Sequence, residues 1–154
     1  MPKSMPTLIS MDSYFDPATY PLEKVVKKAL SGEDRDFQTA CQLLLARTEH
    51  ARDEVIVVFL GLFAFYSDNL ERLTWIVRLL RNVPSEATAH RLFAELRRVK
   101  SSNTTRAYLS AVLDTLAEYP PSLTGDGFAE LSEDGAFSQR RRAQFRALAS
   151  GDPW

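Results

Sequence analysis

The feature that most limits how this chain can fold is an uninterrupted apolar run from Val55 to Phe65. As a helix, the run VIVVFLGLFAF would be about 16 Å long, roughly half the thickness of a bilayer core, so no membrane span is predicted. A buried strand is a competing interpretation, because the first four residues of the run are β-branched. The acidic pair before the run and the turn-forming residues after it favour a helix over 52–66. Since every position is apolar, we expect this helix to be buried nearly all round, with Leu60 and Phe63 fully buried.

Helical spacing of apolar residues continues on both sides of this segment. The predicted helices cover residues 22–30, 35–49, 52–66, 70–82, 86–99, 104–119 and 136–150. Pro120 and Pro121 are expected to stop the sixth helix, and the glycine-rich, acidic stretch 120–135 to form only a short turn anchored by Phe128 and Leu131. Residues 1–21 contain prolines and many apolar side chains, which predicts an N-terminal arm that packs on the body.

Composition predicts a single domain over residues 1–154 that needs no covalent staple. The formal net charge of -1 gives no reason to expect general polyanion binding. Cys41 is the only cysteine, which excludes an internal disulfide and a cysteine cluster for zinc and favours a reducing compartment. The first residues lack the continuous apolar region of a secretory signal, so the expected location is the cytoplasm.

The predicted helices recur in pairs with a period of about 34 residues, which is typical of an α-solenoid. With stretches such as DNLERLTWIVRLLRNVP and NTTRAYLSAVLDTLAEYPP, residues 22–119 resemble the HEAT and armadillo class of helical repeats. The resemblance implies an all-α fold, a right-handed α-α superhelix of about three antiparallel helix pairs, followed by a C-terminal capping helix within residues 120–154. The tetratricopeptide pattern W-x-x-L-G-x-x-Y is missing, although the period is shared.

Catalytic and metal-binding patterns are missing from the sequence. His50 and His90 have no suitable partner at i+3 or i+4, and Cys41 occupies an apolar helix face, so surface and core roles are expected. The clustered carboxylates near residues 33–36 and 53–54 suit helix starts. There is no phosphate-binding glycine loop, G-x-S-x-G or H-E-x-x-H. We therefore expect no enzyme activity, no metal and no cofactor.

Basic residues are the strongest functional signal. Eight lie between Arg72 and Arg106, against only Glu86 and Glu95. The candidate partner-binding residues are Arg72, Arg78, Arg81, Arg97, Arg98, Lys100 and Arg106. In a solenoid, Arg72, Arg78, Arg81 and Arg106 would share one concave groove, because the second helices of successive pairs line that face.

Three roles for this basic group stay open. It is a solvated face with i, i+4 pairs such as Arg91 to Glu95, a surface that recognises an acidic protein, or a phosphate-binding surface for nucleic acid. A second group, Arg140, Arg141, Arg142 and Arg146, is expected to pair locally with Glu130, Glu133 and Asp134. The sequence favours a non-catalytic protein-interaction module, such as an adaptor, an assembly subunit or an immunity protein. The alternative is nucleic-acid binding.

Overall fold

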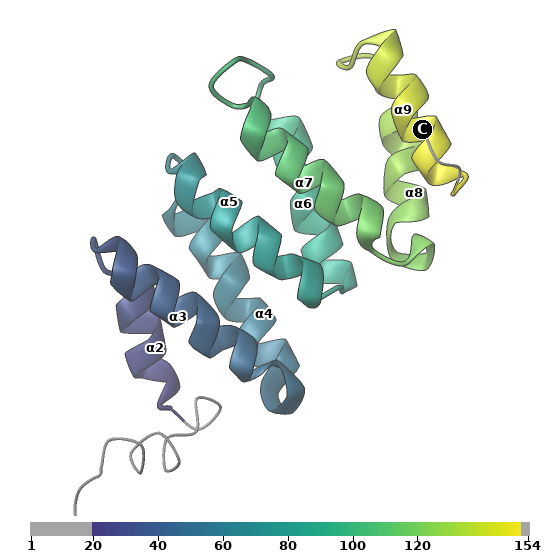
Figure 1. Cartoon of the computed structure of the whole chain (residues 1–154). Coiled ribbons are helices and arrows are strands. Elements are labelled where there is room, and N and C mark those ends of the chain that lie inside the picture. The colour runs from purple at the N-terminus through teal and green to yellow at the C-terminus, as the bar shows by residue number, and fades with distance from the viewer. Residues whose placement is uncertain (1–19, 152–154) are drawn as a thin grey trace, which may run out of the picture. The chain divides into compact units, whose positions relative to one another are not determined.

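The computed structural model describes residues 20–151, and this part of the chain is helical throughout, with no strand among the described residues (Figure 1). Its helices are α2 (Leu22–Ala29), α3 (Asp34–Ala46), α4 (Thr48–Phe65), α5 (Leu70–Leu79), α6 (Glu86–Arg98), α7 (Arg106–Glu118), α8 (Pro121–Ser132) and α9 (Gln139–Ala149), with a short 3-10 turn (Leu80–Asn82) directly after α5. The all-α prediction is confirmed. The predicted N-terminal arm lies almost wholly outside the described residues.

The described chain divides into two compact units, residues 20–58 and residues 59–151. In the first unit, α2 and α3 pack together through the apolar faces that their spacing predicts. Val25 and Ala29 of α2 and Phe37 and Leu44 of α3 are all buried. Cys41 is buried beside them, as the sequence predicts.

The apolar run forms a helix, as predicted, within the longer α4. Ala51 has non-helical backbone angles (φ -145°, ψ 50°), so regular helix begins at residue 52. The Arg47 guanidinium donates to Glu54 Oε1 at 2.9 Å across this kink.

The prediction that this helix is buried nearly all round is wrong. Val57 is 68% exposed and Phe65 60% exposed, while Phe63 is 1% exposed. Leu60 is only partly buried, which corrects the prediction that it is fully buried. Positions 57, 61, 64 and 65 fall on one side of a 3.6-residue helix, and an all-apolar sequence carries no periodic signal that would identify this side as exposed.

In the second unit, α5 and α7 lie side by side and run in the same direction (Figure 1). Thr115 Oγ1 donates to the Val77 carbonyl at 3.2 Å, and the Tyr119 hydroxyl donates to the Leu80 carbonyl at 2.7 Å. α6 packs against α7 and begins at a capping box, in which Ser85 Oγ accepts from the Thr88 N–H and Thr88 Oγ1 accepts from the Ser85 N–H. The buried hydrogen bonds from Thr115 and Tyr119 fix the position of α7 along the axis of α5.

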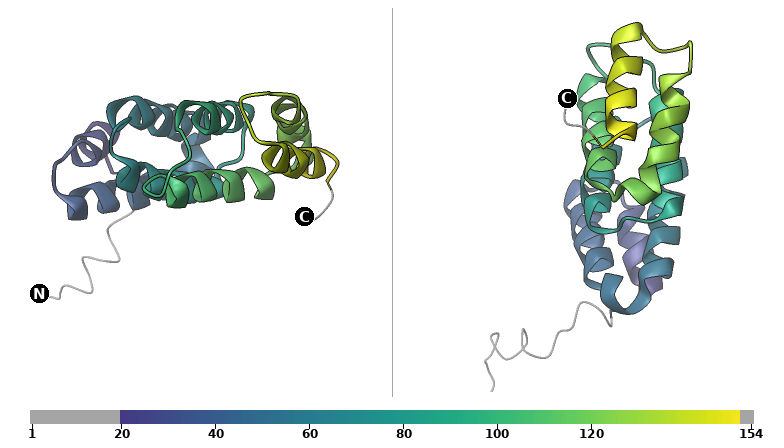
Figure 2. Two further views of the ribbon diagram at one scale, coloured as in Figure 1. Left: turned by 90° about the horizontal axis from the view of Figure 1, so that it is seen from above. Right: turned by 90° about the vertical axis from the view of Figure 1, so that its right-hand side faces the viewer.

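The stretch after Pro120 is a full helix, α8, and not the predicted short turn. Pro121 occupies its first position, where the missing N–H costs nothing because that group has no helical partner. Phe128 and Leu131 are buried, so the predicted anchors are correct. The helix packs closely on α9 (Figure 2), which makes α9 the second member of a pair and not the predicted lone cap.

The last helix ends as its sequence predicts. Gly151 follows it with φ at 77°, and its N–H donates to the Leu148 carbonyl at 3.1 Å. This left-handed conformation is the one that glycine adopts without steric cost at a helix end. At the other end, Ser138 Oγ accepts from the Arg141 N–H at 3.1 Å and caps the first turn of α9.

Candidate functional site

Arg72, a predicted partner-binding residue, lies in the interior and is 6% exposed. Its Nη1 donates to the Tyr66 hydroxyl at 2.7 Å, and its guanidinium carbon lies 5.1 Å from the centre of the Tyr66 ring. The Tyr66 side chain therefore supplies both a hydrogen-bond acceptor and an aromatic face for the charge. Because Arg72 is not on the surface, its predicted role in binding a partner is corrected to a structural one.

Arg81 and Arg106, two of the four residues predicted to share a groove, lie at opposite ends of α7. Arg106 is the first residue of α7, whereas Arg81 Nε pairs with Glu118, the last residue of α7, at 3.2 Å. Twelve helical residues separate these ends by about 18 Å. Arg78 is exposed near the end of α5, and Arg106 Nη2 donates instead to Asn103 Oδ1 at 3.2 Å.

Arg97, Arg98 and Lys100 gather at the C-terminal end of α6. Arg97 reaches Glu130 and Asp134, each at 3.5 Å. Lys100 is exposed, and its ammonium group has no ion pair among the described residues. Of the predicted cations, Arg97 lines one hollow together with Lys100 and another together with Arg98.

Arg98 belongs to a buried network around Glu95. The Glu95 carboxylate accepts from Arg98 Nη2 at 2.6 Å and from Arg98 Nε at 2.9 Å. It also accepts from Arg91 Nη2 at 3.1 Å and from the Tyr108 hydroxyl at 2.6 Å. The predicted Arg91–Glu95 pair is present, but the Glu95 side chain is fully buried and so does not belong to a solvated face.

The electrostatics of this network keep Glu95 ionised. Burial by itself would raise the pKa of Glu95, but hydrogen bonds from Arg98 and Tyr108, together with the positive charges of Arg98 and Arg91, lower that pKa below its ordinary value. The hydrogen bond to Glu95 raises the pKa of Arg98. Burial, and then the Glu95 carboxylate, raise the pKa of Tyr108, so its hydroxyl stays protonated as a donor. Every oxygen of Glu95 already has donors, which gives the network a structural role.

A hollow with an apolar floor lies beside the start of α9, and we name it the apolar groove. It has a volume of about 700 Å³. Its floor is formed by side chains of α6, α7, α9 and the loops between them, namely Leu96, Val99, Leu109, Phe137 and Phe145. Its rim carries Arg97, Lys100, Arg141 and Asp134. Three cations and one carboxylate give this rim a net positive charge.

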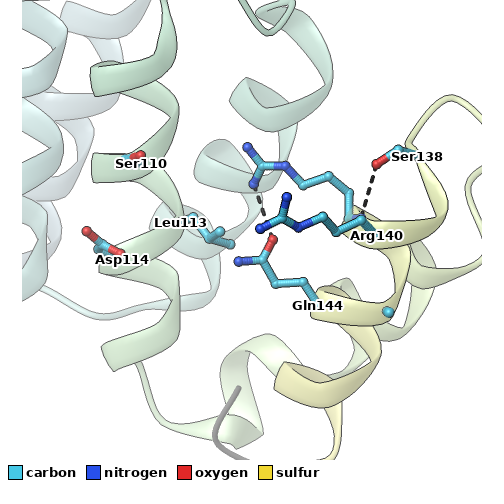
Figure 3. A pocket seen from close by; sticks show the side chains of 8 residues that line it. Ser110, Leu113, Asp114, Ser138, Arg140 and Gln144 are labelled. Carbon is cyan, nitrogen blue, oxygen red and sulfur yellow. Dashed lines mark hydrogen bonds between the residues drawn. The ribbon is translucent and has the colours of Figure 1, made fainter.

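A second hollow, the polar pocket, lies between α7 and α9 and has a volume of about 620 Å³ (Figure 3). Leu113 of α7 faces the side chains of Arg140 and Gln144 of α9 across it. Ser110 and Asp114 complete the α7 wall, and Ser138 and Arg141 lie on the α9 side. Arg140 is exposed and has no acidic partner among the described residues.

Arg141 borders both hollows, and sequence reasoning missed it as a site residue. Its group of arginines is expected to pair with Glu130, Glu133 and Asp134, but Glu130 and Asp134 pair with Arg97 instead. Within residues 20–151, no carboxylate lies within ion-pair distance of Arg140, Arg141, Arg142 or Arg146. The available signal was Ser138, three residues before Arg141, because a serine cap there places Arg141 in the first turn of α9.

The other candidate groups have ordinary surroundings. His50 and His90 are exposed, as predicted. No cluster of three or more histidine, cysteine or acidic side chains suited to a metal ion occurs in residues 20–151. None of the described helices combines the length and apolar character that crossing a bilayer requires.

Comparison with known proteins adds no relationship: no family model, curated protein or solved structure matches this chain.

Proposed function

We propose that this chain is a non-catalytic protein-interaction module of helical-repeat type, which binds its partner at the surface around the start of α9. The observation that carries the proposal is the apolar groove with a cationic rim. Two of the rim cations, Lys100 and Arg141, have no ion pair among the described residues. An apolar groove bordered by such charges is typical of interaction sites, because a second protein can bury the apolar surface and neutralise the charges. Lys100 and Arg141 are the rim residues that would meet an acidic partner, because Arg97 is already paired with Glu130 and Asp134.

The helical-repeat part of the proposal, a HEAT-like superhelix, is supported by local features. The helices are short and their connections are short, and α2 packs on α3 as α8 packs on α9. Second helices of the pairs begin near residues 34, 70, 106 and 139, which retains the period of about 34 residues expected for such repeats.

The non-catalytic part is supported by the state of the ionisable groups. Both oxygens of the buried Glu95 carboxylate already accept hydrogen bonds, from Arg91, Arg98 and Tyr108. A general acid or base needs a titrating group that reaches a substrate, and Glu95 is buried. Roles as an adaptor, an assembly subunit or an immunity protein in the cytoplasm all fit a binding module of this kind.

Nucleic-acid binding is less favoured, because several of the cations on which it would depend are already paired. Arg81 pairs with Glu118, Arg97 with Glu130 and Asp134, and Arg98 with Glu95. Phosphate binding would require these pairs to break or to share their cations.

Site-specific photo-crosslinking tests the proposal. A benzophenone amino acid replaces Ala136, which lines the apolar groove, or Ala129, an exposed alanine of α8 that lines neither hollow. We expect a protein adduct from the position-136 variant and none from the position-129 variant.

The captured protein is then purified and titrated against the wild-type chain and against Lys100→Glu. We expect a stoichiometric complex that Lys100→Glu weakens without lowering the melting temperature. Equal cross-linking at both positions would contradict binding at this surface, and a nucleic-acid adduct in place of a protein would favour the alternative function.

A further inference from the structure

We infer that the surface around α9 recognises an acidic residue next to an aromatic or large aliphatic one in an accessible segment of the partner. The carboxylate would bind Arg141, and the apolar side chain would enter the apolar groove. This inference rests on the proposed function and adds to it the chemistry of the partner. The structural relationship that carries it is the position of one guanidinium on the border between an apolar hollow and a polar one.

Arg141 is suited to a carboxylate ligand because its backbone is held in the capped first turn of α9 and no described carboxylate neutralises its charge. Its backbone N–H is held by Ser138 Oγ at 3.1 Å, and the residue is partly buried. In the described structure the guanidinium makes one long hydrogen bond, from Nη1 to Gln144 Oε1 at 3.4 Å, and no ion pair. Most of its donors therefore stay available. A guanidinium binds a carboxylate through two parallel hydrogen bonds, and partial burial strengthens such a pair.

The groove beside Arg141 is suited to an apolar side chain. Phe145, at the bottom, is 1% exposed, and the Phe137 ring packs edge-on against it with the ring centres 5.1 Å apart. Leu96 and Leu109 extend the apolar floor from α6 and α7. An aromatic side chain placed here gains edge-to-face contacts as well as burial of its apolar surface.

The rest of the rim selects for negative charge in the partner. The Asp134 carboxylate is engaged on both oxygens, by Arg97 Nε at 3.5 Å and by the Ala136 N–H at 2.9 Å. Lys100 adds a cation with no ion pair in the described structure. A segment with a positive charge next to its aromatic residue would meet Lys100 and Arg141, so charge complementarity favours an acidic segment.

Blocked dipeptides test this chemistry directly, because each carries only the two side chains that the inference assigns to the partner. The probes are N-acetyl-Asp-Phe-amide, its Asn-Phe analogue, which lacks the charge, and its Asp-Ala analogue, which lacks the anchor. Each is titrated into the ¹⁵N-labelled full chain, and backbone amide shifts are followed at Lys100, Phe137 and Arg141. We expect dissociation constants on the order of 1 mM for Asp-Phe, because the probe makes few contacts.

The protein variants are Arg141→Gln and, as a matched control, Arg146→Gln. Arg146 is exposed on the same helix and lines neither hollow, so its substitution changes the net charge equally. We expect Arg141→Gln to lower the affinity for Asp-Phe about tenfold and to bind Asp-Phe and Asn-Phe equally well. Arg146→Gln should keep the wild-type affinity for Asp-Phe and the preference over Asn-Phe. The Asp-Ala probe should bind more weakly than Asp-Phe to every variant.

The inference is overturned if no probe gives saturable shifts at these amides, if Asp-Phe and Asn-Phe bind equally well, or if Arg141→Gln behaves like Arg146→Gln. Any of these results with position-specific cross-linking at residue 136 would leave the proposed function intact and remove only the chemistry assigned to the partner. Conversely, cross-linking that does not depend on position would contradict the proposed function even where the dipeptide binds.

Discussion

The Tyr108 hydroxyl donates a 2.6 Å hydrogen bond to Glu95 Oε1 and thereby joins α7 to α6. Arg98 binds the same carboxylate through two nitrogens, and its Nη1 also donates to the Ser67 carbonyl at 3.2 Å. One buried carboxylate therefore links two helices and the loop before α5. Since Tyr108 is only 2% exposed, water cannot replace Glu95 as its acceptor without local opening.

The substitution Glu95→Gln should lower the free energy of unfolding by about 1–3 kcal/mol, because it removes charged hydrogen bonds from a buried site. The matched control is Glu118→Gln, which breaks the Arg81 ion pair. Both side chains of that pair are about half exposed, so the loss should be below about 1 kcal/mol. Urea unfolding of the three proteins measures the difference. Equal losses in the two variants would mean that burial of Glu95 adds nothing to its ion pairs.

Acid should reduce the stability difference between the wild type and Glu95→Gln. The pKa of Glu95 is lowered in the folded protein, so the unfolded chain takes up its proton first as the pH falls. The stabilisation is therefore complete above the unfolded pKa of about 4.3 and is lost as the pH falls toward the lower folded pKa. Melting temperatures from pH 7 down to pH 3 should converge for this pair of proteins. A constant difference over this range would show that the pKa of Glu95 does not change on folding.

Two glycines of α8 should respond in opposite directions to replacement by alanine. A Cβ at Gly127 would overlap the Phe93 ring, which itself packs edge-on against Phe128. At Gly125 the nearest atom, the Ala149 carbonyl oxygen, would lie 3.9 Å away, an ordinary contact. Gly127→Ala should therefore destabilise by about 1–3 kcal/mol through overpacking, whereas Gly125→Ala should stabilise by up to about 1 kcal/mol through helix propensity.

Thermal unfolding followed by circular dichroism measures both glycine variants. If Gly127→Ala raises the melting temperature as much as Gly125→Ala does, the contact with Phe93 is not close.

Helix starts and ends were largely predictable from the sequence because the signals are local. Asn69 Oδ1 accepts from the Arg72 N–H, Ser85 forms its capping box and Gly151 ends the last helix, all within a few residues of the turns they define. The prediction of a short turn in place of α8 is wrong because it treats Pro121 as a stop, although proline is equally suited to the first position of a helix. Whether the residues after Pro121 form a helix or a turn depends on the burial of Phe128 and Leu131 against other helices, and the local sequence does not show that burial.

The candidate site was less predictable, because its residues are brought together by tertiary packing. The pairing of Arg97 with Glu130 and Asp134 spans more than thirty residues, and it leaves Arg141 without the acidic partners that lie nearest to it in sequence. In the same way, the Arg91–Glu95 pair follows from helical spacing, whereas the burial of Glu95 depends on Tyr108 in the next helix.

Two substitutions in α4 should separate its buried side from its exposed side. Phe63 is 1% exposed, and the centre of its ring lies 5.7 Å from the guanidinium carbon of Arg91. Phe63→Ala should therefore lower the free energy of unfolding by about 3–5 kcal/mol. Val57→Ala should change the stability by less than about 0.5 kcal/mol, because this side chain is mostly in solvent. Urea unfolding measures both. A large loss for Val57→Ala would mean that another surface covers this position in solution.

Duplex DNA should bind only weakly at physiological salt, and its affinity should depend little on the basic residues of α5. Each phosphate contact would contribute about -0.9 to the slope of log affinity against log salt. Arg81 is paired with Glu118, which leaves Arg78 as the more available cation at this end of α5. We therefore expect a shallow slope for the wild type. The double variant Arg78→Glu and Arg81→Glu should change this slope by less than the contribution of about one phosphate contact. Fluorescence anisotropy of labelled DNA at two salt concentrations, with wild type and variant, measures both slopes. A steep wild-type slope that becomes shallower by about two contacts in the variant would instead assign phosphate binding to this end of α5.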